Sequence, residues 1–275
     1  MTDKLRLFAE IQGEGSPVLF LPGLGGNHRA FTGIQKVLST RFQTFAIDPR
    51  DTGHSPRTDS EYFLPQMAED VINLMDDHQL NEVNIVGHSM GGMIAQHLAL
   101  LAPQRIRSMV LMSCHAKNYP WKTALVQSWI NLRQIVNAVE FTRFTMPWLL
   151  GPSVFENQAH IDGMIRHVER NPLPQEPEAF VRQGRAVLIH DLLDKLHTIE
   201  IPSLIVSGEL DRVTPPETSQ VLADHLPHST FRVIANVGHL PHIEAPAEIT
   251  SLLNGFIENP REFIDTKLIK QGAGE

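Results

Sequence analysis

The sequence contains a single cysteine, Cys114, so no disulfide bond can form within the chain. It also has no apolar run of the roughly 20 residues that a membrane-spanning helix needs. Basic residues do not cluster, and the formal net charge is −8 at pH 7, which argues against nucleic acid as a partner. The first residues lack the apolar core of a signal peptide. These absences favour a cytoplasmic protein.

What the chain does have is ample material for a core, because 42% of its 275 residues are hydrophobic and only 20% are charged. Short apolar runs alternate with segments of helical spacing. We expect strands at residues 5–11, 18–21, 42–47, 83–86, 109–112, 203–207 and 231–234. Most of the intervening segments are predicted to be helices. This alternation predicts a mostly parallel, doubly wound α/β sheet.

The alternation stops in residues 115–197, which contain no convincing strand but several prolines and all three tryptophans. A segment this long cannot be a plain loop, so we expect a helical subdomain, with residues 1–114 and 198–275 forming the core. Its aromatic residues could form its own core, or they could line the inner face of a lid over an apolar pocket. The candidate pocket residues are His28, Trp121, Trp129 and Trp148.

One motif organises the chain: Gly87-His88-Ser89-Met90-Gly91, which follows a β-branched apolar run and precedes a long apolar helix. In a strand-turn-helix context, this spacing predicts a sharp turn that holds the central serine in a strained conformation. Gly87 and Gly91 leave room for that turn. We therefore expect the Ser89 hydroxyl to stand clear of the sheet, at the positive end of a helix.

Two further candidates also follow strands directly. Asp211 comes after the strand at 203–207, and His239 comes after the strand at 231–234. Ligand and catalytic groups of open α/β sheets gather beyond the carboxyl ends of the strands. Since a serine hydroxyl is a weak nucleophile without a base, and the base needs an anion to orient it, we predict a triad of Ser89, His239 and Asp211.

Other residues compete for two of these roles. His242 could replace His239 as the base, and Glu209 or Glu244 could replace Asp211 as the acid. His88 adjoins the serine, but a residue next to a sharp turn is expected to point elsewhere.

Acyl transfer also needs hydrogen-bond donors for the negative oxygen that develops on the substrate. The backbone N–H of Met90 lies at the expected helix start. The glycine-rich loop Pro22-Gly23-Leu24-Gly25-Gly26 follows a buried strand, and the N–H of Leu24 is the natural second donor.

With these residues, the chain resembles the α/β-hydrolase superfamily over nearly its whole length. The resemblance rests on the glycine-rich loop, the serine motif, and the segments 48–55, 211–215 and 238–246. It implies the same triad and donors, and a helical cap inserted after the sixth strand. Two residues depart from the common pattern: Pro22 replaces a histidine, and Asp51 replaces a glycine. The N-terminus is also short for the full first hairpin of the fold.

The branch that it most resembles contains carboxylesterases, enol-lactone hydrolases, C–C bond hydrolases and cofactor-free haloperoxidases. We expect a serine hydrolase that cleaves a small-molecule ester, thioester or lactone with an apolar part. A C–C bond hydrolase with the same triad and a non-catalytic receptor of the same fold stay open as alternatives. No cofactor is expected. No metal is expected either, because the pairs His225/His228 and His239/His242 lack a third ligand at a recognisable spacing.

Overall fold

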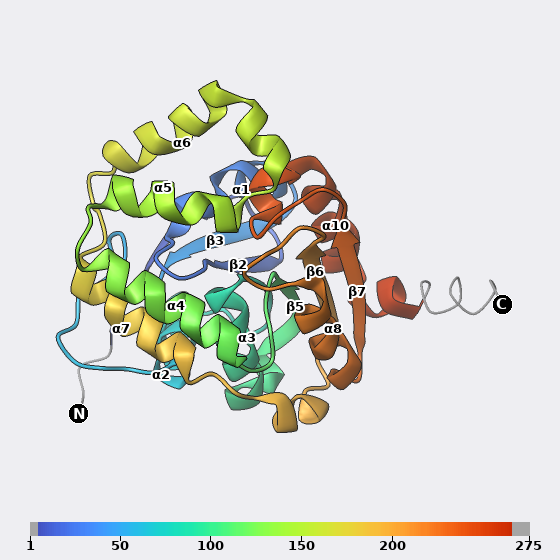
Figure 1. Cartoon of the computed structure of the whole chain (residues 1–275). Helices are drawn as coiled ribbons and strands as arrows, with labels where there is room; N and C mark the ends of the chain where they lie inside the picture. The colour runs from blue at the N-terminus through green and yellow to red at the C-terminus, as the bar shows by residue number, and fades with distance from the viewer. Residues whose placement is uncertain (1–4, 266–275) are drawn as a thin grey trace.

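The computed structural model describes residues 5–265. A seven-stranded sheet in the order β1-β3-β2-β4-β5-β6-β7 forms its centre (Figure 1). The strands are β1 (Phe8–Gln12), β2 (Pro17–Leu21), β3 (Gln43–Asp48), β4 (Val83–His88), β5 (Ile106–Met112), β6 (Ser203–Gly208) and β7 (Ser229–Ile234). Edge strand β1 runs antiparallel to β3, and all other pairs are parallel. The predicted doubly wound sheet is confirmed, with each of the seven expected strands in place.

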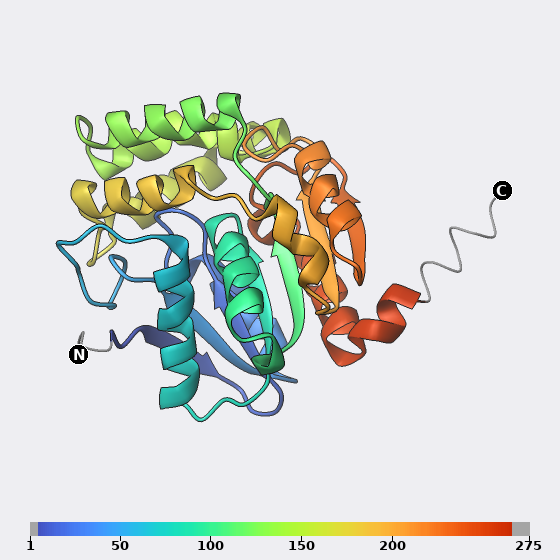
Figure 2. The same ribbon diagram turned by 90° about the horizontal axis from the view of Figure 1, so that it is seen from below.

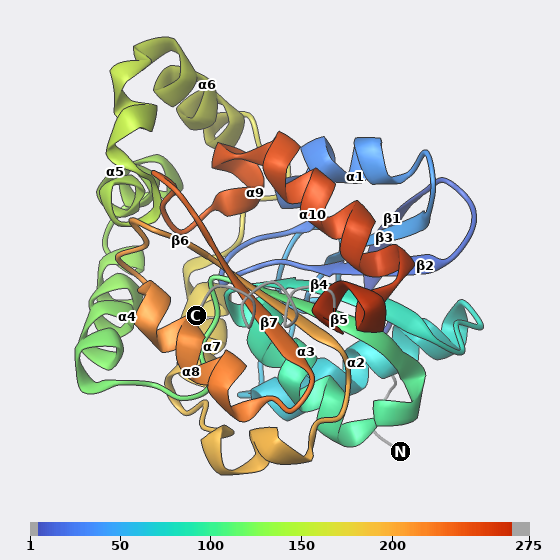
Figure 3. The same ribbon diagram turned by 90° about the vertical axis from the view of Figure 1, so that its right-hand side faces the viewer.

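Helices cover both faces of the sheet (Figure 3). These core helices are α1 (Thr32–Leu38), α2 (Leu64–Asp77), α3 (Met90–Leu101), α8 (Pro216–His225), α9 (Pro241–Glu244) and α10 (Pro246–Glu258). Helices α1 and α10 pack together on one face, while α2 and α3 pack together on the other. The alternation read from the sequence therefore produces a three-layer arrangement in which both faces of the sheet are buried.

Strand β2 shows how the two faces are filled. Leu19 and Leu21 belong to the apolar cluster on the α2–α3 face, whereas Val18 and Phe20 belong to the cluster on the α1–α10 face. All four side chains are at most 1% exposed. A continuous apolar run is what a strand buried on both faces requires, because successive side chains point to opposite sides.

A helical insertion lies between β5 and β6 and stacks over one end of the sheet (Figure 2). It consists of α4 (Pro120–Arg133), α5 (Ala138–Leu149), α6 (Gln158–Glu169) and α7 (Pro177–Leu188), with short 3₁₀ turns. We call these four helices the helical insertion. One apolar cluster joins α4 to α7, and a second joins α5 to α6.

The insertion follows the fifth strand of the described residues, not the sixth as the family resemblance implies. Within residues 5–265, β1 is the one strand before β2, and it pairs with β3. No helix within residues 5–265 combines the length and the apolar character that crossing a membrane demands.

Candidate active site

Ser89 occupies the sharp turn between β4 and α3, with backbone angles φ 51° and ψ −114°. Positive φ is rare for residues other than glycine, so the expected strain at this position is present. Its glycine neighbours allow the turn. A Cβ on Gly91 would lie 1.9 Å from the Leu21 carbonyl oxygen, and one on Gly87 would lie 2.6 Å from the Gly91 carbonyl oxygen.

The three predicted triad residues form one hydrogen-bonded row. His239 Nδ1 lies 2.8 Å from Asp211 Oδ2, and His239 Nε2 lies 3.1 Å from Ser89 Oγ. Because the carboxylate accepts, Nδ1 carries the hydrogen and Nε2 is free to accept from the serine hydroxyl. All three residues are at most 9% exposed. This arrangement can lower the cost of deprotonating the serine as it attacks a carbonyl.

Asp211 is held by its own loop. Its other oxygen, Oδ1, accepts the backbone N–H groups of Val213 and Thr214 at 2.8 and 2.7 Å. These bonds stabilise the charged carboxylate and fix its orientation toward His239.

The competing residues have other partners. Glu209 accepts the N–H of Asn236, and Glu244 accepts the N–H groups of Gly151, Gly238 and Leu240. The His242 ring packs between Phe31 and His88, with centroids 5.1 and 4.6 Å away. Burial lowers the pKa of His242 to about 3, which makes it a poor base near neutral pH. The contacts therefore favour His239 and Asp211.

The glycine-rich loop lies directly against the serine. A Cβ on Gly23 would come within 3.2 Å of Ser89 Cβ, and the Gly26 N–H donates to the Gly23 carbonyl at 2.9 Å, closing a turn around Leu24. Met90 is the first residue of α3, where helix geometry offers its N–H no intrahelical acceptor. Both predicted donors thus lie on segments that flank Ser89.

A buried lysine lies beside the loop that carries Asp211. Lys122 of α4 is 2% exposed, and its Nζ lies 2.7 Å from Thr214 Oγ1 and 2.8 Å from His115 Nδ1. Burial lowers its pKa to about 8, opposed by the charge of Asp211. Burial also holds the pKa of His115 well below its usual value, so a neutral His115 can accept from the ammonium group.

The candidate pocket residues fall into two groups. Trp121 and Trp148 are 43% and 44% exposed, while Trp129 packs against the cluster that joins α4 to α7. His28 is buried, with Nδ1 2.6 Å from Asp48 and Nε2 3.6 Å from Glu10. Both ring nitrogens of His28 therefore face carboxylates, and contact of any of these residues with a substrate stays a prediction.

Among the described residues, His28, Asp48 and His54 form a group whose possible ligand atoms lie within 4.8 Å of one another. Both oxygens of Asp48 already accept backbone N–H groups, from His28 and His54, each at 2.8 Å. Hydrogen bonds of Asp48 with His28 and with His54 hold this group together.

Comparison with known proteins identifies the family. A family model described as the alpha/beta hydrolase fold matches residues 16–148 and 158–246. The chain belongs to this family of hydrolytic enzymes. It is 27% identical over 252 residues to the pimeloyl-[acyl-carrier protein] methyl ester esterase of Aeromonas hydrophila, covering 89% of this chain and 96% of that one.

Solved structures of this family are closely similar. An α/β hydrolase from a Medee basin deep-sea metagenome library has a TM-score of 0.85 and 25% identity, covering 93% of this chain and 95% of that one. An N-acyl homoserine lactone degrading enzyme has a TM-score of 0.80 and 26% identity, covering 93% and 98%.

Four residues make contacts around the site that the sequence did not predict. His88, Glu244, Lys122 and Gln183 each bond to a loop that carries a predicted site residue. From the sequence, Glu244 is an alternative acid and His88 is a residue that points elsewhere, whereas Lys122 and Gln183 have no predicted role. For His88 and Glu244, proximity to a motif was a signal that could have found them. Lys122 and Gln183 lie in the helical insertion, far from any motif, and had no such signal.

Proposed function

We propose that this enzyme is a serine hydrolase in which Ser89 is the nucleophile, His239 the general base and Asp211 the residue that orients His239. The observation that carries the proposal is the continuous row from the Ser89 hydroxyl through the His239 ring to the Asp211 carboxylate. Three groups far apart in the sequence meet in the order that acyl transfer needs.

In the proposed reaction, Ser89 Oγ attacks the carbonyl carbon while its proton passes to His239 Nε2. The N–H groups of Leu24 and Met90 stabilise the resulting oxyanion. His239 then gives the proton to the leaving oxygen or sulfur, and an acyl-enzyme remains on Ser89. Water, deprotonated by His239, attacks the acyl-enzyme and restores the free serine.

Two relatives support the substrate class that we propose. Relatives that act on a methyl ester and on a lactone support an ester, thioester or lactone of a small molecule. We propose that residues 115–197 act as a cap, and that Trp121 and Trp148 contact the apolar part of the substrate. Trp129 is the matched control, because it packs within the cap.

The test combines labelling with turnover. A fluorophosphonate probe should label the wild-type enzyme at Ser89, and Ser89→Ala should remove both the label and the hydrolysis of a short p-nitrophenyl ester, with a loss of several orders of magnitude in kcat. A panel of esters, thioesters, lactones and diketones then separates ester cleavage from C–C bond cleavage. A folded wild-type protein that neither labels nor turns over any of these would instead support a receptor.

A further inference from the structure

Gln183 of α7 joins the helical insertion to the glycine-rich loop. Its side chain is fully buried, and Oε1 accepts the Gly25 N–H at 3.1 Å and the Gln175 Nε2 at 3.0 Å. Its Nε2 donates to the Arg50 carbonyl at 2.9 Å. Since one end of the amide only accepts and the other only donates, its orientation is fixed by these partners.

The bond to Gly25 acts on the segment that carries a proposed oxyanion donor. Gly25 follows Leu24 directly and has φ +75°, a conformation that favours glycine. The Gly26-to-Gly23 hydrogen bond closes the turn on the other side of Leu24. Without Gln183, the Gly25 N–H would lose its acceptor inside the protein, and the Leu24 peptide could rotate away from Ser89.

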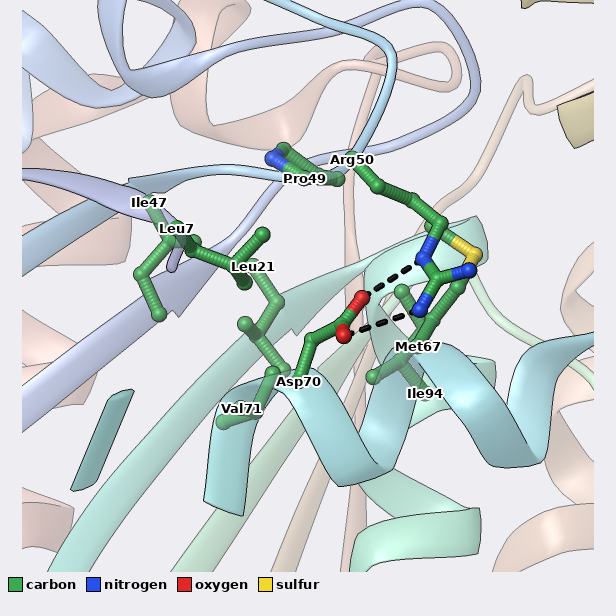
Figure 4. A pocket seen from close by; sticks show the side chains of 9 residues that line it. All are labelled: Leu7, Leu21, Ile47, Pro49, Arg50, Met67, Asp70, Val71 and Ile94. Atoms are coloured by element: carbon green, nitrogen blue, oxygen red, sulfur yellow. Dashed lines mark hydrogen bonds and ion pairs between the residues drawn. The ribbon is translucent and has the colours of Figure 1, made fainter. Parts of the chain in front are cut away.

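The other anchor of Gln183 is itself rigid. The Arg50 guanidinium meets both oxygens of Asp70 beside a small, mostly apolar pocket between β3, α2 and α3 (Figure 4). These two bonds are 2.6 and 2.8 Å long, the geometry of a bidentate pair. The Arg50 carbonyl is thus a fixed point against which Gln183 can position the loop.

The unusual Asp51 completes the attachment of α7. It has φ +68°, is fully buried, and its Oδ2 accepts from Arg182 Nε at 2.9 Å and from the Tyr62 hydroxyl at 3.0 Å. Aspartate tolerates positive φ better than most residues, so it can stand where the family pattern has glycine. Successive residues of α7, Arg182 and Gln183, therefore bind successive residues of the core, Asp51 and Arg50.

The geometry points to Gln183 as a positioning residue for the oxyanion hole: its amide, held by the Arg50 carbonyl, binds the Gly25 N–H and so aims the Leu24 amide. This inference rests on the proposed function of Ser89 and Leu24. It assigns a role in positioning to the Gln183 side chain itself, whereas the neighbouring ion pair of Arg182 with Asp51 joins the same helix to the core without contacting the loop.

The test uses a matched pair of variants on adjacent residues. Gln183→Met removes both hydrogen-bonding groups at nearly constant length, and Arg182→Met removes the ion pair without touching the loop. For each, kcat and KM on a p-nitrophenyl ester, the affinity for a boronic acid that mimics the tetrahedral oxyanion, and the thermal midpoint are measured. Amide hydrogen exchange over residues 22–27 is measured in parallel.

We expect Gln183→Met to lower kcat by roughly ten- to a hundredfold, somewhat less than outright removal of an oxyanion donor. KM should change by less than about threefold, boronate binding should weaken in step with kcat, and exchange at residues 22–27 should accelerate. Arg182→Met should lower the thermal midpoint at least as much but leave kcat within about threefold of wild type. If the methionine variant does not fold, Gln183→Asn takes its place. Its amide is too short to reach the loop, so it should show the same loss of kcat.

The inference is overturned if the Gln183 variants lose only thermal stability, or if Arg182→Met loses kcat and boronate affinity to the same extent. Unchanged exchange at residues 22–27 would also overturn it. Hydrogen exchange does not depend on turnover, so this outcome can be told apart from failure of the proposed function. If the proposed function fails, the wild-type enzyme itself will neither react with the probe nor hydrolyse the ester.

Discussion

His88 Nε2 lies 2.8 Å from the backbone carbonyl oxygen of His239. Because a carbonyl can only accept, Nε2 carries the hydrogen. Burial, followed by the charges of His242 and His239, holds the pKa of His88 well below its usual value, so its ring stays neutral. The residue before the nucleophile thus holds the backbone of the proposed base, across 151 positions of sequence.

Replacing His88 tests this link. His88→Phe removes the donor at similar volume, so the His239 loop should lose its anchor and kcat should fall by about tenfold, since small misplacements of a catalytic group are costly. His88→Gln, which keeps an N–H donor, should retain more of the activity. The measurement is kcat on a p-nitrophenyl ester with both variants confirmed as folded by circular dichroism. Full activity in His88→Phe would show that the bond does not position His239.

Glu244 separates the roles of the two candidate acids. Its carboxylate accepts three backbone N–H groups, two from the His239 loop and one from Gly151 after α5. Glu244→Gln places an NH₂ group against one or more of these donors, so we expect a loss of about 1–3 kcal/mol in unfolding free energy. We expect kcat to fall by about tenfold.

The comparison variant is Asp211→Asn, which should lower kcat by about four orders of magnitude because it disturbs the tautomer of His239. Unfolding free energies come from urea titration and kcat from ester hydrolysis. If the Glu244 variant lost as much activity as the Asp211 variant, Glu244 would be the better candidate for the triad acid.

The buried ring of His242 should make the folded protein less stable in acid. Burial lowers the folded-state pKa of His242 to about 3, against 6.5 for the ordinary group. Below pH 6.5 the unfolded chain therefore binds a proton at this residue, whereas the folded protein does not. The free energy of unfolding is therefore unaffected by His242 above that pH and decreases as the pH falls below it. His242→Phe removes this proton and keeps the ring contact with Phe31.

We expect the stability of His242→Phe relative to wild type to improve by about 2 kcal/mol between pH 8 and pH 5, from 1.36 kcal/mol per pKa unit. Urea titrations at pH 8, 6 and 5 measure this change. Hydrolysis at pH 8 should persist, because His239 is the proposed base. A parallel loss of stability in both proteins would mean that His242 does not titrate in the unfolding transition, and loss of hydrolysis would restore it as a candidate base.

The sequence predicted the parts of this site that local pattern determines. Apolar runs and glycine spacing located the strand ends, the Ser89 turn and the loops of Asp211 and His239, because each is encoded within about ten consecutive residues. The sheet then brought these loops together, as the carboxyl ends of parallel strands meet at one edge.

The second layer of contacts could not be read in this way. Gln183 meets Gly25 across 158 positions, and Arg182 meets Asp51 across 131. Neither pair has a recognisable spacing, and packing of the helical insertion on the core alone brings them together. Asp51 could not be explained from the sequence either, where it only departs from the glycine of the family pattern. In the structure it has an ion-pair partner, Arg182.

Lys122 provides the alkaline counterpart to His242. Burial lowers its folded-state pKa to about 8, against 10.5 for the ordinary group. Between these values the unfolded chain is protonated and the folded protein is not, so the unfolded state binds more protons and stability rises with pH. The groups that face the ammonium are His115, Thr214, Asp211 and Cys114, and the charge of Asp211 favours the protonated form.

Lys122→Met removes this titration, so the stability of wild type relative to the variant should increase by about 3 kcal/mol between pH 8 and pH 10.5, from 1.36 kcal/mol per pKa unit. Exposed Lys36, changed to methionine, is the control and should show little pH-dependent difference. Urea titrations at half-unit intervals of pH give the curve. A difference that stays flat over this range would mean that the buried lysine keeps its proton, and that its attraction to Asp211 outweighs the cost of burial.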